Sequence, residues 1–351
     1  MRILAIETSC DETGVAILEG KLEGSAIVFT VVGSALLSQA ALHAPFGGVY
    51  PSLAKREHQK NLPTILAQAL SGTNIEVDAI AVTHGPGLEP ALWTGIVFAQ
   101  QLAQETGLPL MGVNHMEGHL ISSLVQQGRL ENIQFPVLGL LISGGHTEFV
   151  VMKDWFNYTI VGKTLDDAVG EAFDKVARLL DLPYPGGPEI SRIADESRKK
   201  SDVVSTQFKL PRPMLQSNSC DMSFSGLKTA AMYTLRDKTL TDDEKASFAR
   251  EFEDTVGDVF VTKTRKAILE SGAKTFVIGG GVAANRYLRE RLHALILNEF
   301  DDVEFRLPEL SITGDNAVMI GEAALVHMLK VGIPQGQGED LKAIGKLSLG
   351  K

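Results

Sequence analysis

The chain of 351 residues, 44% of them hydrophobic and 22% charged, has the composition of an ordinary globular protein and a length that suits two domains. Its formal net charge of −10 excludes a protein that coats nucleic acid through overall positive charge, although a local basic patch or a basic partner stays open. Only two cysteines, Cys10 and Cys220, are present, which excludes a disulfide framework or a four-cysteine zinc site.

The first predicted element is a strand, turn and strand at 3–18 (ILAIETSCDETGVAIL), with no charged and apolar leader before it. A second unit of this kind occupies 137–152 (VLGLLISGGHTEFVVM), and the turns of both carry small and hydroxyl residues. Two such units, each opening one half of the chain, favour an internal duplication, although unrelated hairpins can look alike. No apolar run approaches the roughly 20 residues that cross a bilayer, so we expect a cytoplasmic protein without a membrane span.

Strands alternate with helices in both halves, as in the segments 77–115 and 273–297. Such alternation is typical of an α/β protein whose sheets are covered by helices. Polar residues and Pro136 in the segment 127–136 mark a boundary. We therefore expect an N-terminal lobe at 1–132 and a C-terminal lobe at 133–351. The second lobe should contain a mainly helical insertion at about 166–246, and the sequence leaves open whether the C-terminal helix returns to the first lobe.

The segment VNHMEGHLISS carries His115 and His119 at a predicted strand-to-helix junction. Residues four apart on a helix have Cβ atoms roughly 5–6 Å apart, so both imidazoles can converge on one ion. Met116 stands where a zinc protease has the Glu of its HExxH motif, which argues against a protease. An isolated pair of this kind is more often part of a polar helix face, so a metal site needs a third ligand. Asp315 in SITGDNAVMI is a candidate, although an Asp at a helix start equally serves as an N-cap.

Two glycine turns could approach phosphate groups. The turn ISGGHT lies inside the second hairpin, and IGGGVAAN lies between a predicted strand and a helix N-terminus. Glycine lets the backbone come close to an anion, and successive N–H groups can point at it. Neither turn has the Walker lysine or a full GxGxxG pattern, so each alone is weak evidence for nucleotide binding. Together with the duplication they favour nucleotide binding.

Several motifs occur in the order found in one known family. They are ETSCDETGVAI, GGVYPSLAKREH, THGPGLEPALWTGI, VNHMEGH, LISGGHTEF, DDAVGEAFDKVARLL, YPGGP, SFSGLKTA, GGGVAAN and GDNAVMI. Over nearly its whole length, from Met1 to beyond Gly321, the chain resembles the bacterial tRNA N6-adenosine threonylcarbamoyltransferases. The resemblance implies a duplicated actin-like, sugar-kinase-like α/β fold, with two lobes around a central nucleotide cleft. It also implies transfer of a threonylcarbamoyl group from threonylcarbamoyl-AMP to N6 of adenosine 37, in tRNAs that read codons starting with A.

The resemblance further implies the residues of the site. The metal motif corresponds to His115, His119 and Asp315 as ligands of one Fe²⁺ or Zn²⁺ ion per subunit. The nucleotide motifs correspond to Leu141, Ile142, Ser143, Gly144, Gly145, Asp174, Gly187 and Asn285. The chain departs from many relatives at Ser191, where they carry an acidic residue, which puts an acidic ribose contact in doubt. Met222 replaces a more usual aromatic residue, which we interpret as a packing change.

The implied chemistry is attack of an exocyclic amine on a mixed anhydride, with AMP as the leaving group. Asp11 and Glu12 in the first turn are the carboxylates best suited to steer or deprotonate the amine, although acidic residues also favour turns for local reasons. Basic clusters that could face tRNA are Lys55, Arg56 and Lys60; Arg198, Lys199 and Lys200; Lys209 and Arg212; and Arg286, Arg289 and Arg291. Such clusters are more usually solvated surface, so we expect weak, salt-dependent binding of tRNA by the chain alone.

The resemblance implies two protein partners, a TsaB-like pseudo-paralogue and a TsaE-like ATPase, with a homodimer where the first is absent. A separate enzyme would make the activated intermediate. Two alternatives use the same fold: an ATP-dependent kinase or ATPase, and a scaffold that binds nucleotide and partner without chemistry. Neither explains a histidine pair with a third ligand, and the pair together with ISGGHT and Asn285 favours an active enzyme.

Overall fold

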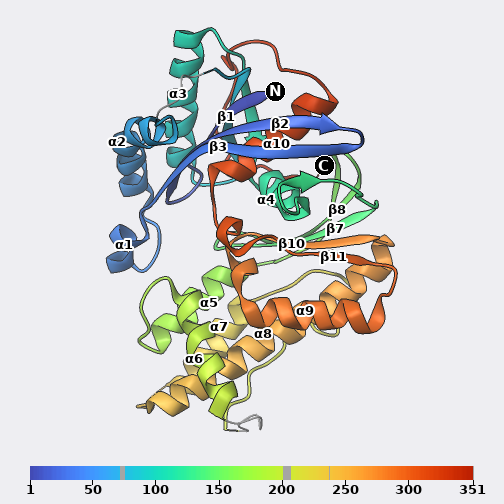
Figure 1. Cartoon of the computed structure of the whole chain (residues 1–351). Helices are drawn as coiled ribbons and strands as arrows, with labels where there is room; N and C mark the ends of the chain where they lie inside the picture. The colour runs from blue at the N-terminus through green and yellow to red at the C-terminus, as the bar shows by residue number, and fades with distance from the viewer. Residues whose placement is uncertain (72–75, 201–206, 237, 351) are drawn as a thin grey trace. The chain divides into compact units, whose positions relative to one another are not determined.

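The computed structural model describes residues 1–71, 76–200, 207–236 and 238–350, and the chain forms two compact units. The first unit combines Met1–Ile133 with Pro308–Leu349, and the second contains Gln134–Leu307 together with Gly350. The C-terminal helix therefore belongs to the first unit, although it follows the whole of the second unit in sequence. Each unit is built on one mixed β-sheet (Figure 1).

The sheet of the first unit has the strand order β5-β4-β1-β2-β3-β6. Its strands are β1 Arg2–Glu7, β2 Glu12–Glu23, β3 Ala26–Ser38, β4 Ala79–Gly85, β5 Leu110–Asn114 and β6 Arg129–Leu130. The antiparallel meander β1-β2-β3 comes from the first hairpin, and β4 and β5 add in parallel on the other side of β1. The carboxyl ends of β1, β4 and β5 therefore lie at one edge of the sheet, where sites collect in α/β proteins.

The sheet of the second unit repeats this arrangement with the order β11-β10-β7-β8-β9. Its strands are β7 Val137–Ile142, β8 Thr147–Asp154, β9 Asn157–Lys163, β10 Thr275–Gly279 and β11 Glu304–Arg306. Strands β7, β8 and β9 form the antiparallel meander, and β10 and β11 add in parallel beside β7. Strand order and direction thus match those of β5-β4-β1-β2-β3, which confirms the predicted duplication.

Helices of the first unit cover both faces of its sheet. They are α1 Ala40–His43, η1 Ala44–Phe46, α2 Pro51–Ala69, α3 Glu89–Thr106, α4 His115–Leu124, η3 Leu310–Ile312 and α10 Ala317–Lys330. Helices α2 and α3 bury apolar side chains such as Leu62 and Ile96 against Leu4 and Ile80 of the sheet. Helix α10 packs on β1 and β2 and against α4 (Figure 1). A Cβ at Gly118 of α4 would lie 3.1 Å from the Ile320 side chain, so these two helices approach closely.

Helices of the second unit are α5 Val169–Leu179, α6 Gly186–Lys200, α7 Ser225–Leu235, α8 Asp242–Ser271, η2 Gly281–Ala284 and α9 Arg286–Glu299. The segment 166–246, expected as a helical insertion, contains α5, α6, α7 and the start of α8, while its residues 201–206 and 237 lie outside the described part. Thr241 and Glu244 form a capping box that starts α8. Phe252 of α8 packs edge-on against Phe173 of α5, with ring centroids 5.0 Å apart, so α8 anchors the helical layer.

None of the helices within the described ranges is both long and apolar enough to cross a membrane. Both cysteines are free thiols, one in each unit.

A buried carboxyl group lies between α10 and α4. Glu322 of α10 is 4% exposed, and its Oε2 has no hydrogen-bond partner among the residues that the structure describes. Burial raises the pKa of Glu322 to about 8 from an ordinary value of 4.5. The folded protein therefore holds this group protonated at neutral pH, while the unfolded chain ionises it.

We expect this group to make folding stability fall as pH rises from about 4.5 to about 8, because only the unfolded state loses the proton in this window. The Glu322→Gln variant lacks this proton equilibrium. Its free energy of unfolding should therefore exceed that of the wild type by an amount that grows between pH 5 and pH 8, on the order of 4 kcal/mol at most. Denaturant unfolding at the two pH values measures the difference. The exposed Glu105→Gln serves as the control, and equal pH slopes for Glu322→Gln and the wild type would contradict the prediction.

Candidate metal centre and nucleotide site

The two histidines lie at the start of α4, where it follows β5. The Asn114 side chain caps the helix by accepting from the backbone N–H groups of Met116 at 2.9 Å and Glu117 at 3.3 Å. This cap begins the helix at His115, and His119 follows one turn later on the same face. Both histidines are buried: His115 is 4% exposed and His119 is 2% exposed. The start of α4 thus places the pair at the carboxyl edge of the sheet.

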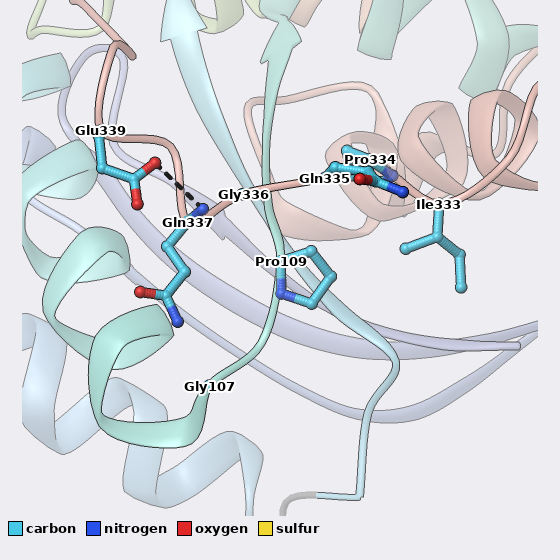
Figure 2. A pocket seen from close by; sticks show the side chains of 8 residues that line it. All are labelled: Gly107, Pro109, Ile333, Pro334, Gln335, Gly336, Gln337 and Glu339. Atoms are coloured by element: carbon cyan, nitrogen blue, oxygen red, sulfur yellow. Dashed lines mark hydrogen bonds between the residues drawn. The ribbon is translucent and has the colours of Figure 1, made fainter.

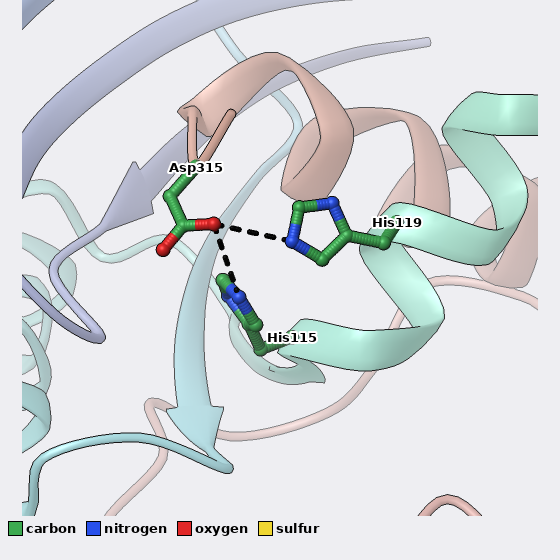
Figure 3. Close-up of side chains that lie close together, drawn as sticks. All are labelled: His115, His119 and Asp315. Atoms are coloured by element: carbon green, nitrogen blue, oxygen red, sulfur yellow. Dashed lines mark hydrogen bonds and ion pairs between the residues drawn. The ribbon is translucent and has the colours of Figure 1, made fainter. Parts of the chain in front are cut away.

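Asp315 joins the two histidines from the turn before α10, as Figure 3 shows. Its Oδ1 lies 3.1 Å from Nε2 of His119 and 3.4 Å from Nε2 of His115. The N-cap of α10 is the next residue, Asn316, whose side chain accepts from the N–H of Met319 at 3.0 Å. The alternative explanation of Asp315 as a helix cap is therefore wrong. All three ligand-type atoms lie within 4.8 Å of one another.

Glu7, the last residue of β1, orients His115. Its Oε2 lies 3.1 Å from Nδ1 of His115 and accepts from Thr83 Oγ1 at 2.5 Å, while its Oε1 accepts from the N–H of Ser9. An Nδ1–H directed at this carboxylate leaves Nε2 of His115 to face Asp315. A carboxylate behind a histidine is the usual support of a metal-binding imidazole, because it fixes the tautomer and the ring orientation.

The electrostatics of this cluster favour a cation. Burial opposes protonation of His115, but the charges of Asp315 and Glu7 outweigh it and raise its pKa well above the ordinary value. Burial likewise opposes ionisation of Asp315 and Glu7, but His115 outweighs it and lowers the pKa of each. Burial lowers the pKa of His119, which is therefore neutral. Two ionised carboxylates against one protonated imidazole leave an excess of negative charge.

Two imidazole nitrogens and one carboxylate oxygen are a ligand set that Fe²⁺ or Zn²⁺ accepts with coordination positions left open. The buried positions, the shared direction of both Nε2 atoms and the support from Glu7 all fit such an ion. Glu117, the acid nearest in sequence, instead accepts from Nε2 of His327 at 2.9 Å. It is thus engaged away from the cluster.

Asp11 ends the turn of the first hairpin, and Glu12 is the first residue of β2. Asp11 is 8% exposed, and Glu12 accepts from Ser38 Oγ at 3.2 Å. Burial, the charges of Asp315 and Asp11, and a hydrogen bond to Asp11 raise the pKa of Glu12 to about 9. Glu12 therefore keeps its proton at neutral pH and hydrogen-bonds the side chain of Asp11.

The second unit carries the residues predicted for the nucleotide. Leu141 and Ile142 end β7 as buried residues, and Ser143 opens an exposed turn in which its N–H donates to the carbonyl of His146 at 2.8 Å. At Gly144 and Gly145 an added Cβ would meet no atom within 4 Å, so this turn has an open face. Its glycines therefore leave room for a ligand and are not required by internal packing.

The second glycine turn lies against this first one. Gly280 has φ = 90°, and a Cβ there would come within 2.4 Å of the carbonyl oxygen of Ile142. Glycine is thus required for both the left-handed conformation and the close approach. The contact brings the strand-to-helix turn that ends at Asn285 beside the end of β7.

Asp174 and Gly187 meet at the N-terminus of α6. The Asp174 carboxylate accepts from the N–H of Gly186 at 2.7 Å and from that of Gly187. Burial raises its pKa, partly offset by these two N–H groups. A Cβ at Gly187 would have Phe173 Cβ as its nearest contact, at 3.9 Å, so packing leaves this position open. The arrangement is that of a helix N-terminus with space above it.

Asn285 and Ser191 meet at a residue that the sequence did not suggest, Glu253 of α8. Ser191 Oγ donates to Glu253 Oε1 at 2.8 Å, and Asn285 Nδ2 donates to the same oxygen at 2.7 Å. Glu253 was missed because α8 alternates charged and apolar residues as any amphipathic helix does. Glu7 was missed because it ends an apolar strand, and a single acid at such an end is the one signal that could have indicated it.

Most of the basic clusters form ion pairs. Carboxylates within 4.0 Å pair with Lys60, Arg198, Lys199, Lys200, Arg212, Arg286 and Arg291. Lys55, Arg56 and Lys209 are exposed and form no ion pair with any residue in the described ranges. The ordinary explanation of these clusters as solvated or paired surface thus holds for most of them.

An open hollow of about 540 Å³ lies on the first unit beside the C-terminal segment (Figure 2). It is lined by Gly107, Pro109, Ile333, Pro334, Gln335, Gly336, Gln337 and Glu339. Its one titratable group, the Glu339 carboxylate, accepts from the N–H of Gln337 at 3.3 Å. The hollow contains none of the predicted site residues.

The matching family model and the curated relatives name one family. The family model described as "TsaD: tRNA N6-adenosine threonylcarbamoyltransferase" matches residues 30–322. A curated relative of that name from Polynucleobacter necessarius is 43% identical, over 94% of this chain and 93% of its own. The relative from Thermosipho africanus is 41% identical, over 99% of this chain and 100% of its own. A relative of that name from Bacillus thuringiensis is 43% identical, over 92% of this chain and 90% of its own.

Solved structures of HypF share the fold. The full-length HypF in its phosphate- and nucleotide-bound form aligns with a TM-score of 0.56 and 13% identity, over 95% of this chain and 47% of its own. HypF from T. kodakarensis aligns with a TM-score of 0.58 and 13% identity, over 93% of this chain and 47% of its own. This chain thus spans about half of each HypF chain. The likeness confirms the predicted actin-like, sugar-kinase-like fold class.

If Glu7 supports His115 as a metal ligand, Glu7→Gln should weaken the binding of Zn²⁺ by about 10- to 100-fold, because the neutral amide no longer fixes and polarises the imidazole. Competition with a chromophoric chelator measures the affinity. Glu117→Gln, a buried acid on α4 that bonds His327 instead, is the matched control and should bind Zn²⁺ as the wild type does. Unchanged affinity in Glu7→Gln would refute the supporting role.

Proposed function

Because the chain belongs to the tRNA N6-adenosine threonylcarbamoyltransferase family, it is an acyltransferase, and we propose that His115, His119 and Asp315 hold the divalent metal ion of its active site. The reaction transfers the threonylcarbamoyl group to N6 of adenosine 37 of tRNA. One structural observation carries the proposal: two buried imidazoles and a half-buried carboxylate from two separate segments converge, with a second carboxylate behind one of the imidazoles. Fe²⁺ and Zn²⁺ both suit this ligand set.

The donor, threonylcarbamoyl-AMP, is a mixed anhydride and is therefore already activated. In the reaction, the N6 nitrogen forms a bond to the carbamoyl carbon, the bond from that carbon to the phosphate oxygen breaks, AMP leaves and N6 loses one proton. Such a reaction depends mainly on positioning and on stabilisation of charge. When bound, the metal ion would supply Lewis-acid polarisation of a donor oxygen. His115, His119 and Asp315 would hold it.

The nucleotide part of the donor would bind to the second unit. Support comes from the exposed turn at Ser143, Gly144 and Gly145, whose open backbone suits a phosphate. The free space above Gly187 at the N-terminus of α6 suits a ribose, and Asn285 offers an amide N–H nearby through the α6–α8–α9 contacts. Leu141, Ile142 and Asp174 would shape the site from within, since the first two are buried and the third holds the start of α6.

Asp11 would accept the proton that N6 loses. Its carboxylate shares a hydrogen with Glu12, whose pKa is raised to about 9 mainly by burial, so Glu12 acts as the neutral donor of the pair. A carboxylate that already accepts one hydrogen bond keeps further lone pairs for the amine. The pair would thus orient the amine and remove its proton, while the leaving AMP needs no acid because phosphate is a good leaving group.

The tRNA substrate follows from the family, and a cytoplasmic location, which we propose, is consistent with an enzyme that modifies tRNA. We further propose a TsaB-like pseudo-paralogue and a TsaE-like ATPase as partners, with self-association where the former is missing. The paired state of most basic clusters supports this, because few free cations remain to bind tRNA without help. The kinase, ATPase and scaffold alternatives are not favoured, since relatives of the transferase name cover more than nine-tenths of the chain.

A transfer assay tests the metal proposal. With pre-formed threonylcarbamoyl-AMP, unmodified tRNA and the two partners, the wild type should form modified adenosine. The double variant His115→Ala/His119→Ala should lose its metal together with at least about 100-fold of its rate. Metal content is measured in parallel. Modification that survives loss of the metal would demote the histidines to a structural role, and no product from the wild type would favour the scaffold.

The two acids of the first turn should respond differently in the same assay. Asp11→Asn removes the base and should lower kcat by about 100-fold. Glu12→Gln replaces one neutral hydrogen-bonding group by another and should have a much smaller effect. Single-turnover rates at saturating donor measure both. If Asp11→Asn and Glu12→Gln both left the rate unchanged, neither acid would take part in catalysis.

A further inference from the structure

The Glu253 carboxylate is a buried charge at the meeting point of α6, α8 and α9. The residue is 0% exposed, and all of its hydrogen-bond partners are donors: Ser191 at 2.8 Å, Asn285 at 2.7 Å and the guanidinium of Arg198. Three donors on one buried carboxylate require that it is ionised, because a protonated acid would turn a donor toward one of them.

Arg198 holds this charge from the side of α6. Its second guanidinium nitrogen donates to Asp254 at 2.6 Å, and its guanidinium carbon lies 3.6 Å from the ring centroid of Tyr287. Burial opposes the charge of Arg198, but the Glu253 and Asp254 carboxylates outweigh it and raise its pKa. The ion pair therefore persists at neutral pH, and the Glu253 carboxylate stays in place.

The bond to Glu253 fixes the orientation of the Asn285 amide. Asn285 Oδ1 accepts from the N–H of Leu288 at 2.9 Å as the N-cap of α9, and Nδ2 donates to Glu253. If the amide were flipped, Oδ1 would face the Glu253 carboxylate and the NH2 group would face the N–H of Leu288, and neither pair could form a hydrogen bond. One N–H of Asn285 is left over, so the amide nitrogen can meet a ligand as a donor.

The same bond fixes the polarity of Ser191. A serine hydroxyl has one proton and two lone pairs, and it can ordinarily donate or accept. Here the proton is committed to a buried carboxylate, so the partly exposed oxygen offers only lone pairs. Ser191 is thus an acceptor, strengthened by the charge behind it.

We propose that Glu253 is a positioning residue that makes Ser191 an acceptor and Asn285 a donor toward the two neighbouring hydroxyl groups of a nucleotide ribose. The two side-chain atoms contact the same carboxylate oxygen and are therefore neighbours, as the two hydroxyls of a ribose are. One hydroxyl donates to Ser191 and the other accepts from Asn285. The proposal rests on the proposed nucleotide site of the second unit, and adds to it the source of its preference for ribose.

Binding of AMP and of its 2′-deoxy and 3′-deoxy analogues to the full chain, measured by calorimetry, tests this proposal. The wild type should prefer AMP over at least one analogue. Glu253→Gln should lower that preference by about tenfold, because the neutral amide can turn its own N–H toward Ser191. Glu251→Gln is the matched control: Glu251 is a buried acid on α8 that bonds Arg212 and the N–H of Leu210, and its loss should leave the preference unchanged.

Moving the charge should restore the preference. In Ser191→Asp/Glu253→Gln, the carboxylate acceptor stands at the ribose itself, and the ratio of AMP to deoxy-analogue affinity should return toward that of the wild type. Ser191→Thr keeps the hydroxyl and should keep the ratio, whereas Ser191→Ala should lose it. These two variants can still overturn the proposal if Glu253→Gln does not fold, since they leave the buried ion pair intact.

An unchanged ratio in Glu253→Gln, or in Ser191→Ala, overturns the positioning role while the nucleotide site stands. Absence of AMP binding to the wild type overturns the nucleotide site itself, and the positioning role with it. The proposal is also overturned if Glu251→Gln lowers the ratio of AMP to deoxy-analogue affinity as much as Glu253→Gln does. A general loosening of α8 would then explain both results.

Discussion

The first unit depends on the interaction of a histidine with one buried and one half-buried carboxylate at one edge of its sheet. Glu7 ends β1, His115 begins α4 after β5, and Asp315 precedes α10. The close approach of α4 and α10 at Gly118 fixes the third group relative to the other two. A buried pair of acids is tolerated only where opposite charge compensates it. Without a metal, protonated His115 supplies part of that charge. A bound cation would take the place of the Nε2 proton and supply the compensating charge, so the geometry and the electrostatics lead to the same chemistry.

The duplication could be predicted because it is local. Each hairpin is one continuous segment, and its alternating apolar residues identify the meander β1-β2-β3 or β7-β8-β9 without tertiary information. The membership of α10 in the first unit could not be predicted in the same way. Its sequence is apolar on most sides, which indicates burial but not the sheet against which it packs.

The candidate metal site could be predicted only in part from the sequence. The spacing of His115 and His119 predicts a shared helix face, and the structure agrees. Asp315 was ambiguous because Asp, Asn316 and the helix start are adjacent, and either residue could cap. Only the structure shows that Asn316 caps, since that depends on which side chain the turn directs at the N–H of Met319. The role of Glu7 could not be predicted from the sequence, because its contacts with Thr83 and His115 depend on the pairing of β1 with β4.

Both candidate sites contain a buried carboxylate that hydrogen-bonds a contact residue and so fixes which of its atoms can bind a ligand. Glu7 commits one nitrogen of His115 and so leaves the other for a metal ion, and Glu253 commits the proton of Ser191 and so leaves its lone pairs for a hydroxyl. A charge placed behind the contact residue is shielded from water, so its effect on polarity is stronger than that of an exposed acid. It also leaves a smaller, neutral side chain at the ligand. At the proposed ribose site, Ser191 in place of an acid therefore need not remove the acceptor, because Glu253 of α8 supplies the negative charge behind it.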